Sequence, residues 1–165
     1  MILGMSLATF TLAHVFISIV GIASGLIVIE RIMRNRALGL SNTIFLVSTI
    51  ATSATGFLFP FKGFTPAQAV GVISLVILAL AVFALYAGNL IGPWRWIYAV
   101  TAVIALYLNV FVAVVQAFQK VGRLRVLAPT QSEPPFALAQ GAVLVLFMLI
   151  AVVAIRRFRW NPRPE

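Results

Sequence analysis

His14 is the only histidine in the sequence and the only strongly titratable side chain inside a long apolar stretch. A charge is costly to bury in hydrocarbon, so an ionisable group at membrane depth is a candidate functional residue. A neutral imidazole can also join helices, because it accepts a hydrogen bond from one group and donates to another. Three roles are therefore open: helix–helix contact, which we favour, contact with a proton or substrate, and ligation of haem or a metal.

A redox role would use haem or quinone as the cofactor. Haem held by two histidines needs a second histidine, which one chain does not have. Met5, Met148 or the His14 of a symmetric dimer could supply the second axial ligand. No spacing in the sequence demands this arrangement, so the cofactor stays open.

Other polar side chains fall at a depth similar to that of His14. On the 3.6-residue period they share faces with glycine and alanine, and in lipid such a face turns toward other helices. If these faces converge, we expect a small polar pocket in the outer half of a bundle. Its candidate lining is His14, Ser18, Thr52, Ser53, Thr55, Ser74, Asn109 and Gln116. The alternative is that amides join the helices while hydroxyls bond back to carbonyls of their own helix.

Familiar catalytic groupings are missing from the sequence. It contains no aspartate and no cysteine, and its three acids are all glutamate. Without aspartate there is no Ser-His-Asp set, and the sequence also shows no paired-carboxylate site, no metal cluster and no phosphate-binding loop. We name no catalytic residue and no metal ligand, and we favour a protein that is not an enzyme.

The composition is that of a membrane protein. Hydrophobic residues make up 62% of the 165 positions and charged residues 9%, whereas soluble domains average about 25% charged residues. The net charge of +9 would favour nucleic acid in a soluble protein. Here the basic residues flank apolar runs, which is typical of membrane anchoring. We expect the lipid bilayer as a partner and no nucleic acid.

Apolar runs predict an all-α bundle of five transmembrane helices that forms a single domain over residues 1–165, with no soluble domain. A spanning helix needs about 20 residues. The spans are expected at about 5–29, 41–60, 66–91, 96–118 and 135–156. The second is the most polar, so we expect it at the centre of the bundle. The last is nearly all aliphatic, and we expect it at the edge.

Local motifs refine this picture. Thr65-Pro66-Ala67-Gln68 predicts a capped helix start, and the spacing of Glu30 and Arg34 suits a helical ion pair. Trp94, Arg95 and Trp96 are predicted to anchor a turn at the headgroup level. Glu133 is the one carboxylate of the long connector from residue 120 to 135. It is either solvated, which we favour, or part of a lid over the pocket.

Five spans place the termini on opposite sides of the membrane. One side then carries eight basic residues, including a short basic tail at 156–165, and the other carries four. The positive-inside rule puts the first side in the cytoplasm and the N-terminus outside. The sequence has no Asn-x-Ser/Thr glycosylation site, which is compatible with a bacterial inner membrane.

Three functions compete. The first, which we favour, is a non-catalytic accessory or assembly subunit that binds other membrane subunits or a second copy of itself. The second is a small transporter or channel whose polar pathway runs through the first, second and fourth helices. The third is a redox subunit that holds haem or quinone.

Overall fold

Six helices are found among the residues that the structure describes. The computed structural model describes residues 2–60, 63 and 65–159. Over these residues the chain is all-helical and contains no strand beyond one isolated bridge between Ile2 and Met5. The helices are α1 (Leu7–Met33), α2 (Gly39–Gly56), α3 (Pro66–Tyr86), α4 (Pro93–Lys120), α5 (Gly122–Leu127) and α6 (Pro134–Arg157).

Capping residues fix where the helices begin. The hydroxyl of Thr65 accepts from the Gln68 backbone, and the Gln68 side chain accepts from the Thr65 backbone at 2.8 Å. This confirms the capping box predicted for α3. Ser6 caps α1 by accepting from the backbone N–H of Thr9 at 3.1 Å.

Several helix ends differ from the predicted ones, and α2 ends at Gly56 instead of residue 60. α1 continues past Ile29 to Met33, and the expected pair of Glu30 and Arg34 forms on its last turn at 2.7 Å. α3 ends at Tyr86 instead of near residue 91. The chain turns there because Asn89 and Leu90 adopt positive φ angles of 48° and 55°, which a helix does not tolerate.

Four of the helices, α1, α3, α4 and α6, are long and apolar enough to cross a membrane. The prediction of five spans is not confirmed, because α2 does not meet this standard. It has 18 residues, and Ser, Thr and Asn make up much of its sequence. At a rise of 1.5 Å per residue, α2 is about 27 Å long.

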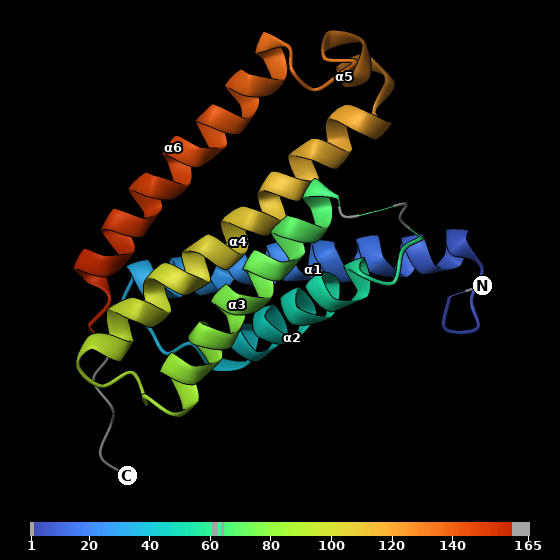
Figure 1. Ribbon diagram of the computed structural model, residues 1–165. Helices are drawn as coiled ribbons and strands as arrows, with labels where there is room; N and C mark the ends of the chain where they lie inside the picture. Colours follow the sequence, from blue (N-terminus) through green and yellow to red (C-terminus); the bar gives the residue numbers. More distant parts are fainter. Residues whose placement is uncertain (1, 61–62, 64, 160–165) are drawn as a thin grey trace.

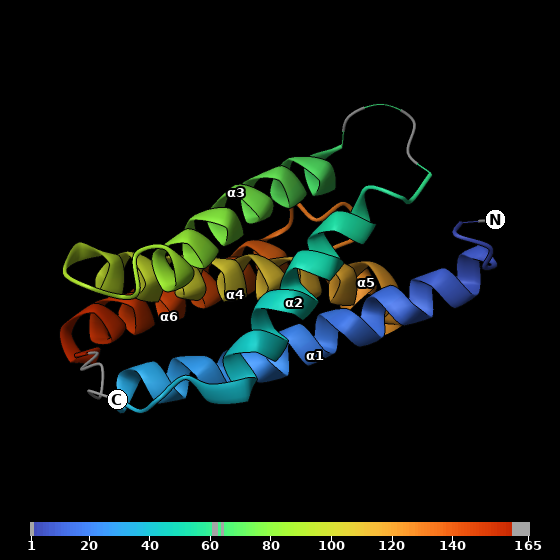
Figure 2. The same ribbon diagram turned by 90° about the horizontal axis from the view of Figure 1, so that it is seen from below.

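The helix at the centre of the bundle is α4, so the prediction that the second helix would be central is wrong. α4 packs against α1, α3, α5 and α6, whereas α2 lies mainly against α1 and α3 (Figures 1 and 2). The reason lies in the residue sizes along α4. Ala99, Ala102 and Ala105 are almost completely buried, and their small side chains let neighbouring helices approach closely.

The expected edge position of α6 is confirmed. It contacts α4 and α1 and leaves most of its large apolar side chains exposed. Figures 1 and 2 also show that α1 and α2 run side by side in opposite directions. The α1–α2 connector, the α3–α4 turn and the end of α6 gather at one end of the bundle, and α5 lies at the other.

Candidate functional site

Four of the predicted site residues meet where α1 crosses the second half of α2. His14 Nδ1 and Thr55 Oγ1 lie 2.9 Å apart, and Ser18 Oγ lies 3.4 Å from Thr52 Oγ1. Phe59 packs edge-on against the His14 ring with 5.1 Å between the centroids. We call His14, Ser18, Thr52 and Thr55 the His14 set.

Hydrogen bonding around Thr55 fixes the proton of neutral His14. The Thr55 hydroxyl has one proton, and its Oγ1 lies 2.6 Å from the carbonyl oxygen of Ala51 on the same helix. Because that proton is used in the backbone contact, the bond to His14 requires a donor on the imidazole. This geometry predicts that neutral His14 carries its proton on Nδ1. Its Nε2 is left as an acceptor and has no hydrogen-bond partner among the described residues.

The helices α1, α2 and α4 meet at a glycine, at a level two turns along α1 from His14 and one turn along α2 from Thr52. Asn109 Nδ2 donates to Thr49 Oγ1 at 3.2 Å, which joins α4 to α2. Gly21 of α1 lies against this bond. A Cβ at Gly21 would be 3.2 Å from Thr49 Oγ1 and 3.3 Å from Asn109 Nδ2. The three helices approach closely because position 21 has no side chain.

An apolar layer follows the Asn109–Thr49 bond. Phe45 and Leu106 are completely buried, and both press against Gly25 of α1. A Cβ at Gly25 would lie 2.7 Å from Leu106 Cδ1 and 2.8 Å from Phe45 Cε2. Gly21 and Gly25 thus form a Gly-x-x-x-Gly pair, a motif typical of close helix contacts in membranes. Here the pair is used inside the chain.

A second polar contact lies beyond this layer. The Tyr98 hydroxyl of α4 donates to Asn42 Oδ1 of α2, and both side chains are buried. Tyr98 is among the largest fully buried side chains, so its hydroxyl needs a partner. The Asn42–Tyr98 bond is separated from the His14 set by the packed layer of Phe45, Leu106 and Gly25.

The remaining candidates of the predicted pocket are not joined to the His14 set by hydrogen bonds. Ser53 and Ser74 are buried, and Gln116 is half-buried on α4. On the α3 side of α2, a Cβ at Gly71 would lie 3.8 Å from the Ser53 carbonyl oxygen. A shallow, open groove with an apolar lining lies elsewhere, on the outward face of α6. A ligand bound at the predicted pocket stays a prediction.

The predicted interfacial residues lie at the start of α4. Trp94 packs against Phe83 with 5.0 Å between ring centroids and lies directly over Gly88. Trp96 is exposed, and Arg95 is half-buried with no hydrogen-bond partner for its Nε among the described residues. Trp94 therefore closes the α3–α4 turn, and the membrane-anchoring role of the three residues stays a prediction.

Glu133 holds the N-cap position of α6, and its side chain orders the connector before the helix. Its carboxylate accepts from the Thr130 backbone at 3.1 Å, from the Thr130 hydroxyl at 2.9 Å and from the Ser132 backbone at 3.1 Å. Partial desolvation raises the pKa of this carboxyl, but these hydrogen bonds outweigh it and lower the pKa below its ordinary value. No basic residue of the connector is among its contacts in the described chain.

Three contacts were not predicted as parts of a site. Two of them are the Asn109–Thr49 and Asn42–Tyr98 bonds. The periodicity shows that these residues lie on polar helix faces, but the register between helices decides which of them pair. Gln140 of α6 also donates to the Phe111 carbonyl oxygen of α4 at 3.1 Å. Its signal in the sequence was a lone amide near the start of an aliphatic stretch.

The chemistry available in this arrangement is hydrogen bonding, with one imidazole acceptor at its end. The described residues contain no group of three His, Cys, Asp or Glu side chains that could hold a metal ion. No family model, curated protein or solved structure matches this chain.

Proposed function

We propose that this chain is a non-catalytic integral membrane protein that serves as an accessory or assembly subunit of a larger membrane complex. Its polar side chains join helices of the same chain. Hydrogen bonds to α2 are formed by His14, Asn109 and Tyr98. Polar contacts of this kind hold helices together in lipid, where an unpaired polar group is costly.

One observation carries this proposal: the layer of Phe45, Leu106 and Gly25 between the two groups of polar contacts. A transport pathway through α1, α2 and α4 would need water or substrate to pass this level. A Cβ at Gly25 would already lie within 3 Å of both neighbouring side chains, which leaves no room for a file of water. The layer supports a structural role for the polar contacts over a conducting one.

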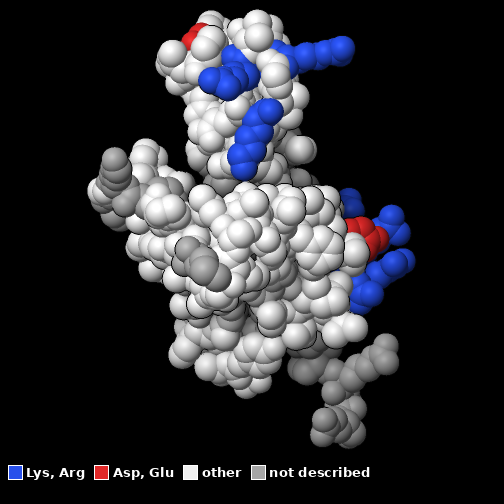
Figure 3. All heavy atoms as spheres, turned by 90° about the vertical axis from the view of Figure 1, so that its right-hand side faces the viewer, with Lys and Arg blue, Asp and Glu red and all other residues white. Residues whose placement is uncertain are grey.

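We propose that α2 also crosses the bilayer, as the second of five spans. It runs back along α1 from the basic connector to Gly56, next to His14, and its polar face is covered by α1 and α4. With five spans, the arginine-rich end of the bundle faces the cytoplasm of a bacterial cell and the N-terminus lies outside. On the face shown in Figure 3, the visible Lys and Arg side chains form two separate groups with an uncharged surface between them. Lys62 and residues 160–165 of the tail lie outside the described residues.

The outward face of α6 is the surface that would meet other subunits. It forms an open apolar groove that includes Ala137, Gly141 and Ala142. A Cβ at Gly141 would meet nothing within 4 Å, in contrast to Gly21 and Gly25. Small residues of this kind let a neighbouring helix approach closely.

The test is native mass spectrometry of the protein extracted gently from its own membrane. A defined complex with another membrane protein is expected, and His14→Ala should leave that complex intact. A chain that is recovered alone at every detergent concentration, or one that catalyses flux in liposomes, contradicts an accessory role.

A second candidate, a redox subunit, is supported by the state of His14. Its Nδ1 is held by Thr55 and its Nε2 has no partner among the described residues, which is the arrangement that metal-ligating histidines use. A haem held this way needs a second axial ligand, which the His14 of another copy could provide. A visible absorbance band that disappears in His14→Ala would support this candidate, and a colourless, quinone-free preparation would contradict it.

A further inference from the structure

Arginines gather at the end of the bundle where α1 and α6 finish and α4 begins. Asn35 joins the α1–α2 connector to the segment after α6, because its Oδ1 accepts from the backbone N–H of Arg159 at 2.7 Å. Glu30 is the only acid at this end among the described residues. The arginines are Arg31, Arg34, Arg36, Arg95, Arg156, Arg157 and Arg159.

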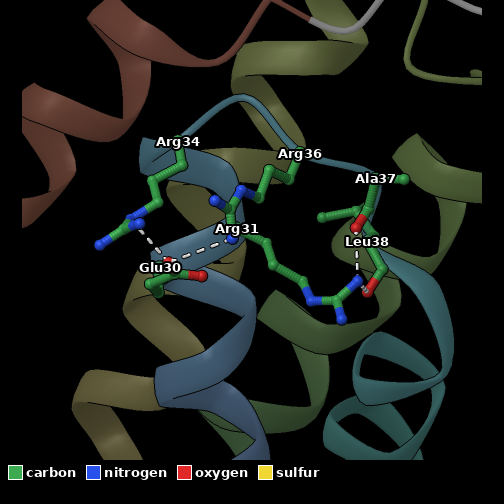
Figure 4. Close-up of polar contacts among 6 residues, drawn as sticks. All are labelled: Glu30, Arg31, Arg34, Arg36, Ala37 and Leu38. Carbon is green, nitrogen blue, oxygen red and sulfur yellow. Dashed lines mark hydrogen bonds and ion pairs between the residues drawn. The ribbon is translucent and has the colours of Figure 1, made fainter.

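Arg31 has a structural role in the connector. Its Nη1 donates to the Ala37 carbonyl oxygen at 2.8 Å and lies 3.4 Å from that of Leu38 (Figure 4). A Cβ at Gly39 would lie 2.9 Å from the same nitrogen, and Gly39 has a φ of +62°. Arg31 therefore holds the turn that starts α2 and is not free to bind a ligand with this nitrogen.

Arg34 and Arg36 share a single carboxylate. Arg34 Nε lies 2.7 Å from Glu30 Oε1, and Arg36 Nη1 lies 3.9 Å from the same oxygen, as Figure 4 shows. The three side chains are between 41% and 62% exposed. Ion pairs this exposed are weak, so another anion can compete for the two guanidinium groups.

We propose that Arg34 and Arg36, with Arg156 and Arg157 of the α6 end, bind the headgroup phosphate of an anionic phospholipid, and that Glu30 competes with this phosphate. The planar guanidinium fork matches the geometry of phosphate oxygens. The arginines lie at the ends of helices that fit a membrane, where headgroups are found. The site rests on the membrane location in the proposed function, and it is independent of the accessory role.

The first test compares two pairs of arginines with the same spacing. The protein is purified in detergent with equal amounts of phosphatidylglycerol and phosphatidylcholine, and the retained lipid is measured by native mass spectrometry. R34Q/R36Q should lower phosphatidylglycerol retention by at least fivefold, since each basic residue near a membrane contributes roughly 1 kcal/mol. R123Q/R125Q, at the opposite end, makes the same change in charge and should have little effect. Equal losses in both variants overturn the site.

The second test predicts a gain that a folding defect cannot imitate. E30Q removes the competing carboxylate, so phosphatidylglycerol retention should rise above that of the unmodified protein. Unchanged or lower retention overturns the competition, and displacement of the lipid by inorganic phosphate at matched concentration shows that free phosphate is the ligand instead. If the protein stays in the membrane fraction while these predictions fail, only the lipid site is lost. If it leaves the membrane fraction, the proposed function fails as well.

Discussion

Asn109 on α4 and Thr49 on α2 form a hydrogen bond of 3.2 Å directly beside Gly21 of α1. Three helices are brought together at this one contact. A Cβ at position 21 would lie 3.2 Å from Thr49 Oγ1 and 3.3 Å from Asn109 Nδ2, so a side chain there would press against both partners. Packing and hydrogen bonding therefore stabilise the same site, and each can be tested separately.

The Asn109–Thr49 bond should show a measurable coupling energy. Asn109→Ala and Thr49→Ala each remove the bond, so the double variant should be less destabilised than the sum of the two. We expect a coupling of about 0.6 kcal/mol, the average for hydrogen bonds between membrane helices. Reversible unfolding in mixed micelles gives the free energies. Strictly additive effects would show that the contact contributes nothing.

Gly25 should be far more sensitive to substitution than Gly141. In Gly25→Ala the new methyl group would overlap Leu106 and Phe45, both completely buried, and overpacking of this kind costs about 1–3 kcal/mol. Gly141→Ala is the matched control, because nothing lies within 4 Å of the new Cβ. It should raise stability by about 0.5–1 kcal/mol through helix propensity. A thermal melt in one detergent compares the two, and equal effects would contradict the packing described for Gly25.

The sequence predicts which helix faces carry polar residues, because the 3.6-residue period depends only on residue order. That is why His14, Ser18, Thr52 and Thr55 could be assigned to one site. The same periodicity placed Asn109 at a suitable depth. Its partner, Thr49, lies one turn from the predicted Thr52 and Ser53. The sequence could not single out Thr49, because the register between helices is set by packing at Gly21 and Gly25.

The central position of α4 could not be read from polarity. The prediction took the most polar helix as the central one, on the reasoning that polar faces avoid lipid. The structure shows that covering one face of α2 is enough to bury or half-bury most of its polar side chains. α4 is surrounded because Ala99, Ala102 and Ala105 allow close approach of its neighbours. Small side chains therefore decide which helix is central, and their effect depends on the shape of the helix that faces them.

The connector before α6 should loosen in acid. The pKa of Glu133 lies below its ordinary value of 4.5, so the carboxylate form is favoured in the folded chain. Its hydrogen bonds are fully present above pH 4.5 and are lost as the pH falls through the lowered pKa. The amide proton shifts of Thr130 and Ser132, followed by NMR between pH 6 and pH 3, should move with this protonation. Glu133→Gln should abolish that movement, and a titration that persists in the variant would assign it to another group.

The proton of neutral His14 should be found on Nδ1. The Thr55 hydroxyl donates to the Ala51 carbonyl oxygen at 2.6 Å, so it can only accept from the imidazole at 2.9 Å. Nitrogen-15 chemical shifts of a histidine-labelled sample distinguish the two neutral forms. Thr55→Val keeps the shape of the side chain and removes the acceptor, so it should release the preference for Nδ1. Ser18→Ala is the matched control, since the Ser18 hydroxyl bonds to the His14 backbone and not to its ring. A proton on Nε2 in the unmodified protein would reverse the direction of the bond and remove the free acceptor on which the redox candidate depends.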